Sequence, residues 1–282
     1  MMKYIQKWFG KWILLSLLWF VLNSIDFSQL QLNDMQQSAL LGRTLMSMLD
    51  SLILCWVLAK SGKHGVQLAI VIFLAVFGMK ILLTVIEAAY LPDLQPLVLP
   101  LLINGAIASL LWSLTAVALT VGFTENPISS DGQEKPEWHQ KWYQWILKPI
   151  LLAIIWMVLF VFFGGVVFMN IARLIDPQAL ASYTNLVMPD WVLPFQGLRA
   201  LLWLPLALPL LMQLYGKYNR VLFLSGSVFA VWMGSNLFMA LDLPAGLRYA
   251  HLAEVMTECF VFGVLVFLIF ARKGQRAKIY ST

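Results

Sequence analysis

Long runs of apolar residues alternate with short polar turns along most of the chain. Each run holds about 20 residues, the length that an α-helix needs to cross the hydrocarbon core of a bilayer. We expect eight such spans, at approximately residues 9–25, 38–59, 66–90, 97–122, 145–170, 193–214, 220–241 and 247–271. The pattern predicts an all-α, polytopic integral membrane protein with eight transmembrane helices, in which residues 1–282 form a single transmembrane domain.

The composition points to a lipid environment. Hydrophobic residues make up 61% of the chain and charged residues 12%, whereas an ordinary soluble domain is about 45–50% apolar and about 25% charged. The lipid bilayer is therefore the expected partner, and no protein partner is indicated. The net charge of +5 comes from lysines and arginines spread over short turns, which argues against a nucleic-acid partner.

Basic residues gather in alternate turns. The turns on one side contain Lys3, Lys7, Lys11, Lys60, Lys63, Lys135, Lys141, Lys148, Lys217, Arg220, Arg272, Lys273, Arg276 and Lys278. The turns on the other side contain Arg173 and Arg248. Because cytoplasmic loops carry an excess of Lys and Arg, both termini are expected in the cytoplasm. Compact turns without sorting signals favour the plasma (inner) membrane.

The two halves of the chain resemble each other. Arg43 recurs as Arg199, Gly62-Lys63 as Gly216-Lys217, and the acid-Leu-Pro pattern near Glu87 as Asp242-Leu-Pro244. The offset between matching residues is about 155 residues. Four spans in each half predict a parallel 4+4 internal repeat, with halves 1–123 and 137–282 and a cytoplasmic linker 124–136. The alternative is chance, since apolar sequences align easily.

The residues after this linker carry tryptophans at helical spacing. Trp138, Trp142 and Trp145 are separated by four and three residues. Aromatic residues beside lysines are typical of the membrane–water interface. The spacing predicts a short helix at the headgroup level before the fifth span.

Four charged residues lie within the second and third spans. Arg43 and Asp50 are seven residues apart on one span, and Lys80 and Glu87 are seven apart on the next. Seven residues are close to two helical turns, so each pair shares one face of its helix. Because the two spans form an antiparallel hairpin, we expect Arg43 opposite Glu87 and Asp50 opposite Lys80.

The last span carries a second set of ionisable residues. His251, Glu254 and Glu258 share one stripe of this helix, and Arg199 lies about as deep as Glu254. A charge left at mid-bilayer costs about 2.5–3.5 kcal/mol on insertion scales, so these groups should face one another beneath the extracytoplasmic surface. The candidate ligand- or ion-binding residues are Arg43, Asp50, Lys80, Glu87, Arg199, His251, Glu254 and Glu258.

Three functions remain open from these residues. The first is an outward-facing polar site that binds or transports a small polar or anionic solute, an ion or a lipid headgroup, with Glu254 and Glu258 as a proton relay. The second is an intramembrane enzyme that acts on a lipid-linked or peptide substrate, with His251 and Glu254 as catalytic acid and base. The third is an assembly or scaffold subunit whose buried ion pairs only fix helix positions.

Motifs do not decide among these functions. The chain contains no G-x-S-x-G, H-E-x-x-H or G-x-x-x-x-G-K-[ST] sequence. Cys55 and Cys259 both fall within spans and show no zinc spacing. A single imidazole among the membrane carboxylates is a poor ligand set for zinc or haem. No metal and no cofactor is therefore expected.

Overall fold

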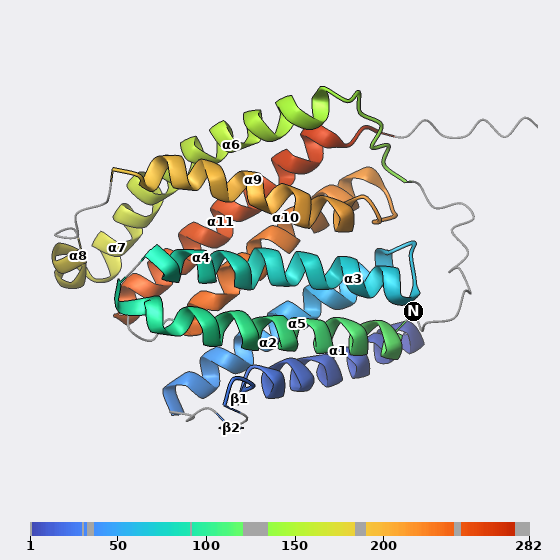
Figure 1. Ribbon diagram of the computed structural model, residues 1–282, viewed down its shortest axis with the longest axis horizontal. Helices are drawn as coiled ribbons and strands as arrows, with labels where there is room; N and C mark the ends of the chain where they lie inside the picture. The colour runs from blue at the N-terminus through green and yellow to red at the C-terminus, as the bar shows by residue number, and fades with distance from the viewer. Residues whose placement is uncertain are drawn as a thin grey trace, which may run out of the picture.

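The computed structural model describes residues 2–29, 31–32, 37–90, 92–120, 135–183, 190–239 and 244–273. The described chain is almost entirely helical (Figure 1). Its α-helices are α1 (Met2–Leu22), α2 (Gln37–Lys60), α3 (Gly65–Val76), α4 (Leu83–Tyr90), α5 (Val98–Thr120), α6 (Gln144–Phe162), α7 (Met169–Ile175), α8 (Pro177–Tyr183), α9 (Val192–Leu211), α10 (Tyr218–Gly234) and α11 (Ala245–Phe270).

Four shorter helical segments and one small hairpin complete the described elements. The segments η1 (Phe77–Leu82) and η3 (Phe163–Phe168) are π-helical, and η2 (Pro92–Leu97) and η4 (Ser235–Met239) are 3₁₀-helical. The strands β1 (Ile25–Asp26) and β2 (Gln31–Leu32) pair in antiparallel fashion between α1 and α2. The all-α class is confirmed.

Seven helical stretches among the described residues are long and apolar enough to cross a membrane. They are Ala39–Lys60, Gly65–Ile86, Gln95–Thr120, Gln144–Ile175, Val192–Leu211, Tyr218–Met239 and Ala245–Phe270. Each coincides with one of the expected spans. In α1, the apolar helical stretch Trp8–Leu22 is shorter than the other seven. The eighth span and the internal repeat therefore stay predictions, and nearly all of the expected linker 124–136 lies outside the described residues.

The helices pack in two groups (Figure 1). In the first group α1 packs against α2 and α5, and α3 packs against α5. In the second group α6 packs against α9 and α11, and α10 packs against α11. The groups meet where α2 contacts α10 and η4, and where α9 contacts α3 and η1. This central contact positions the charged residues described below.

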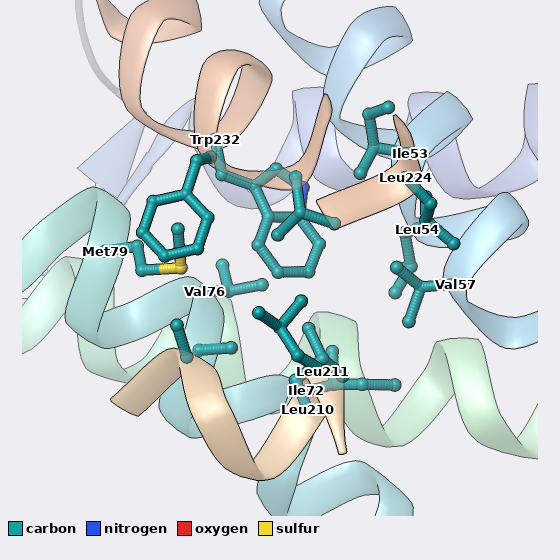
Figure 2. Close-up of a cluster of buried hydrophobic side chains, with 14 of the residues drawn as sticks. Ile53, Leu54, Val57, Ile72, Val76, Met79, Leu210, Leu211, Leu224 and Trp232 are labelled. Carbon is teal, nitrogen blue, oxygen red and sulfur yellow. The ribbon is translucent and has the colours of Figure 1, made fainter. Parts of the chain in front are cut away.

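Apolar side chains from both groups fill the centre. Figure 2 shows Leu54 and Val57 of α2 and Ile72 and Val76 of α3 in one cluster with side chains of α9 and α10. All four of these side chains are buried. Lipid tails are as apolar as these residues, so close van der Waals packing rather than burial from water drives the association of membrane helices.

Several turns meet at one end of the helices, which we call the basic end because Lys60, Lys63, Lys135, Lys217 and Arg272 lie there. Ser61 and Leu214 form an antiparallel bridge between the α2–α3 turn and the α9–α10 turn. The amide of Tyr215 donates to the carbonyl of Lys60 at 2.7 Å. The Lys135 ammonium lies 4.9 Å from the centre of the Tyr215 ring.

The segment before α6 differs from the sequence prediction. Residues 135–141 are not helical, and Glu137 pairs with Arg272 in a β-bridge. Trp138 is buried edge-on against Phe267, 5.7 Å between ring centroids. The predicted interfacial helix is therefore wrong here, because backbone pairing with the end of α11 replaces the local helical preference.

Candidate functional site

Asp50 and Lys80 lie together, as the antiparallel hairpin predicts. Lys80 Nζ is 3.0 Å from Asp50 Oδ2, and the two side chains are 1% and 0% exposed. Asp50 comes from the middle of α2, and Lys80 comes from the π-helical turn η1. A π turn inside an α-helix shifts the residues that follow it around the axis. This turn faces the second helix group, because a Cβ at Gly78 would lie 2.3 Å from Leu206 of α9.

Two further side chains complete this buried group, which we call the Asp50 node (Trp19, Asp50, Lys80 and Ser235). Lys80 Nζ donates to Ser235 Oγ at 2.7 Å, and Ser235 Oγ donates to Asp50 Oδ1 at 2.7 Å. Trp19 Nε1 donates to Asp50 Oδ2 at 2.8 Å. Trp19 also stacks on Trp112 of α5, with ring centroids 4.3 Å apart. Both carboxylate oxygens of Asp50 thus have donors, so the node holds α1, α2, η1 and η4 together.

Arg43 lies apart from this node. Its side chain is buried, and Nη1 donates to Ser24 Oγ at 2.9 Å, near the end of α1. The side chain of Glu87 is outside the described residues, so the expected pair of Arg43 with Glu87 is not tested. Among the described side chains, no carboxylate forms an ion pair with Arg43.

The stripe on α11 forms a second polar group, together with Arg199. We call His251, Glu254, Glu258 and Arg199 the α11 cluster. His251 Nδ1 is 2.6 Å from Glu254 Oε2, and these side chains are 34% and 5% exposed. The Phe168 ring of η3 packs edge-on against the His251 ring. Glu254 is thus buried behind a histidine that stays partly exposed.

A glycine of the second π-helical segment makes room for Glu254. A Cβ built on Gly164 would lie 3.3 Å from Glu254 Oε1. A Cβ on the next residue, Gly165, would have no neighbour within 4 Å among the described atoms. The backbone of η3 therefore approaches the carboxylate closely at Gly164, whereas Gly165 is exposed at the surface of the described structure.

Glu258 is the deepest member of the α11 cluster. Its side chain is 2% exposed, and Oε1 has no hydrogen-bond partner among the described residues. Glu254 and Arg199 both act on it electrostatically. The Arg199 guanidinium lies over the Trp203 ring, 5.4 Å from its centre. A buried carboxylate that keeps an unpaired oxygen is costly, about 1–3 kcal/mol or more for a charged group.

The Asp50 node and the α11 cluster lie on different sides of α11. Met256 follows Glu254 by two residues, which is about 200° around an α-helix. Met256 faces α10, because a Cβ on Gly234 would lie 2.5 Å from it. Glu254 faces η3 instead. In the described part of the chain no hydrogen bond or ion pair joins the two groups, so the candidates do not form the single network expected from their depths.

Outside the spans, the Asp26 carboxylate has a perturbed pKa. Hydrogen bonds from Ser28 and Asn104 lower the pKa of Asp26 from its usual value of 3.8. The Asn104 amide of α5 donates to Asp26 Oδ1 at 3.0 Å, so this contact holds the β1–β2 hairpin on α5. Among the described residues, no three His, Cys, Asp or Glu side chains are grouped as a metal site would require.

Sequence reasoning missed the partners Trp19 and Ser235. Ser235 follows Lys80 by 155 residues, the offset of the predicted repeat, and this correspondence was the available signal. Comparison with known proteins gives no relative: no protein-family model, no curated protein and no solved structure matches the chain.

Proposed function

We propose that this multi-pass protein takes up protons at the α11 cluster, together with a small polar or anionic solute. The observation that carries the proposal is Glu258, a buried carboxylate next to Glu254 and Arg199, with one oxygen that has no hydrogen-bond partner among the described residues. An ionisable residue inside a membrane span is a functional-site hypothesis by default. Two neighbouring carboxylates in a dry site repel each other, which favours binding of a proton between them.

The geometry supports a proton path that begins at the membrane surface. His251 is partly exposed, contacts Glu254 directly, and lies on the outer part of α11. Glu258 lies one turn deeper on the same stripe. Imidazole is suited to pass protons near neutral pH, so we assign His251 as the entry, Glu254 as the relay and Glu258 as the proton acceptor.

The charges of the cluster couple the proton to a solute. With a neutral imidazole, two carboxylates face one guanidinium and leave one excess negative charge. A proton on Glu258 removes that excess negative charge. The positive field of Arg199 then acts on any solute that enters the site. Arginine binds carboxylates and phosphates through its planar fork of donors, so a small anion or a polar acceptor is the expected solute.

Orientation follows the positive-inside rule. The turns of the basic end carry the lysines and arginines, and α11 begins at the opposite end. We therefore assign the basic end to the cytoplasm and the His251 end to the outside. A cysteine introduced at Lys63 should react with a membrane-impermeant maleimide only from the cytoplasmic side, because Cys55 and Cys259 are buried. Labelling from the outside would refute this orientation.

We further propose that the two helix groups are the halves of a parallel repeat. The packing of α1 on α2 corresponds to that of α6 on α9, and α3 on α5 to α10 on α11. Equivalent turns meet at Ser61 and Leu214. An experimental structure in which the halves superpose by rotation about an axis along the helices supports this repeat. A best superposition about an axis in the membrane plane would contradict it.

Proton uptake can be tested in liposomes that contain the purified protein and a trapped pH indicator. After the external pH is lowered, the wild-type protein should acidify the lumen faster than empty liposomes do. Glu258→Gln should reduce this rate to that of empty liposomes, because the amide cannot bind the proton. Thr257→Ala is the matched control, since Thr257 is exposed on the same helix and donates only to the Ala253 carbonyl.

Infrared difference spectra give a readout independent of flux. A pH titration of the wild type should show the band of a protonated carboxyl group, and Glu258→Gln should lose it. Thr257→Ala should keep it. A folded Glu258→Gln protein that keeps the proton uptake rate and the protonated-carboxyl band of the wild type would refute the proposal.

A further inference from the structure

A groove opens at the end of the molecule opposite the basic end, between α2, η4 and α11. It has a volume of about 80 Å³ and is partly open to its surroundings. Leu41 and Leu45 of α2, Phe238 of η4 and Leu252 of α11 supply most of its wall, and Arg248 and Tyr249 lie in the first turns of α11. The groove shares no residue with the α11 cluster or the Asp50 node.

Close backbone packing forms one side of the groove. A Cβ on Gly42 would lie 2.2 Å from the carbonyl oxygen of Phe238. Only a glycine allows α2 to approach η4 this closely. The rim is exposed, with Leu41 66% and Tyr249 55% accessible. In a membrane, this rim faces lipid.

Arg248 brings a positive charge to an otherwise apolar lining. Its guanidinium lies 5.8 Å from the centre of the Tyr249 ring. In the part of the chain that the structure describes, no carboxylate pairs with it. The acid of the adjacent α7–α8 junction, Asp176, lies next to Gly246, which is about 200° around α11 from Arg248. The N-terminus of α11 adds a partial positive charge on the same side of the membrane.

We propose that this groove binds one phospholipid with an anionic headgroup. The phosphate lies on Arg248, and the upper part of one acyl chain lies along Leu41, Leu45 and Leu252. Charge complementarity selects the headgroup, because Arg248 has no carboxylate partner among the described side chains and attracts an anion at the membrane boundary. The apolar wall selects a lipid over a free phosphate, since a dissolved anion gains nothing from leucine side chains.

Native mass spectrometry of the purified full-length chain tests the proposal. The probes are phosphatidylglycerol, which is anionic, and phosphatidylcholine, which is zwitterionic, each titrated into the same detergent. The wild type should retain phosphatidylglycerol preferentially. Arg248→Gln should weaken that binding by about ten-fold or more, as expected for loss of one charge-assisted contact. Arg173→Gln, an exposed arginine at the same end, should bind as the wild type does.

A second pair of variants tests the acyl-chain part of the site. Leu45→Trp fills the groove and should weaken the binding of both lipids. Leu40→Trp places the same bulk on an exposed neighbouring position of α2 outside the groove and should leave binding unchanged. Equal phosphatidylglycerol binding by wild type, Arg248→Gln and Leu45→Trp would overturn the proposal. Displacement of the lipid by millimolar inorganic phosphate would also overturn it in favour of a free-anion site.

Discussion

Neutralising one member of the buried Asp50–Lys80 pair should destabilise the protein far more than replacing both members. Lys80 has two polar contacts, the Asp50 carboxylate and the Ser235 hydroxyl. Asp50→Asn removes the negative charge and leaves an ammonium group that is 1% exposed with only neutral acceptors, the Ser235 hydroxyl and the asparagine side-chain oxygen. Removal of one partner from a buried ion pair costs about 3–5 kcal/mol, and we expect the upper part of that range here.

Lys80→Met should cost less than Asp50→Asn. The carboxylate of Asp50 keeps two donors after this change, Trp19 Nε1 at 2.8 Å and Ser235 Oγ at 2.7 Å. Hydrogen bonds to a charged group each contribute about 1.5–3 kcal/mol, so they offset part of the lost attraction. We therefore expect the free energy of unfolding to fall by about 3 kcal/mol, the lower end of the range for breaking a buried ion pair.

The double variant Asp50→Asn/Lys80→Met should be more stable than Asp50→Asn alone. Asn still accepts from Trp19, and the methionine fills the volume of the lysine stem without a charge, so the total loss should be about 1 kcal/mol. The assay is unfolding in mixed micelles with a rising fraction of SDS, followed by helical circular dichroism. Losses that simply add in the double variant would refute the reasoning, because independent residues add.

Two other predictions concern packing and pH. Gly42→Ala should lower stability by about 1–3 kcal/mol, because the new Cβ would collide with the Phe238 backbone. Gly10→Ala should be neutral or stabilising, because a Cβ there would have no neighbour within 4 Å. Equal thermal unfolding midpoints for the two variants would contradict this prediction. Because the pKa of Asp26 is lowered on folding, its ionised carboxylate contributes to the stability of the folded protein. This stabilisation is complete above the usual pKa of 3.8 and is lost as the pH falls through the lower pKa of the folded state. Asp26→Asn should therefore flatten the acid side of the stability–pH curve, and an unchanged slope would count against it.

The sequence predicted seven of the eight expected apolar helices well, because their length and hydropathy depend on local composition alone. The meeting of Asp50 with Lys80 was also predictable, since a short turn fixes the antiparallel register of two neighbouring helices. The rotation of α11 about its own axis could not be predicted from the sequence. Periodicity places Glu254 and Glu258 on one stripe, but only the packing of Met256 against Gly234 shows that this stripe faces away from α10.

Long-range pairing accounts for the other differences. Trp138 lies at helical spacing from Trp142, yet the backbone near it pairs with Arg272, far along the chain. Ser235 carries no charge and gives no hydropathy signal, although it contacts both members of the ion pair. Such partners are set by how the two helix groups meet, which no local pattern encodes.

The position of Lys80 has a consequence for the order in which the protein is built. A lysine at mid-span costs about 2.5–3.5 kcal/mol when it enters lipid alone. Asp50 is synthesised before Lys80 on the preceding helix, so the pair can form while this hairpin leaves the translocation machinery. Ser235 emerges much later. The charge of Lys80 is thus neutralised during early insertion by Asp50 on the preceding helix. The later helices only add the final hydrogen bonds to a pair that is already neutral.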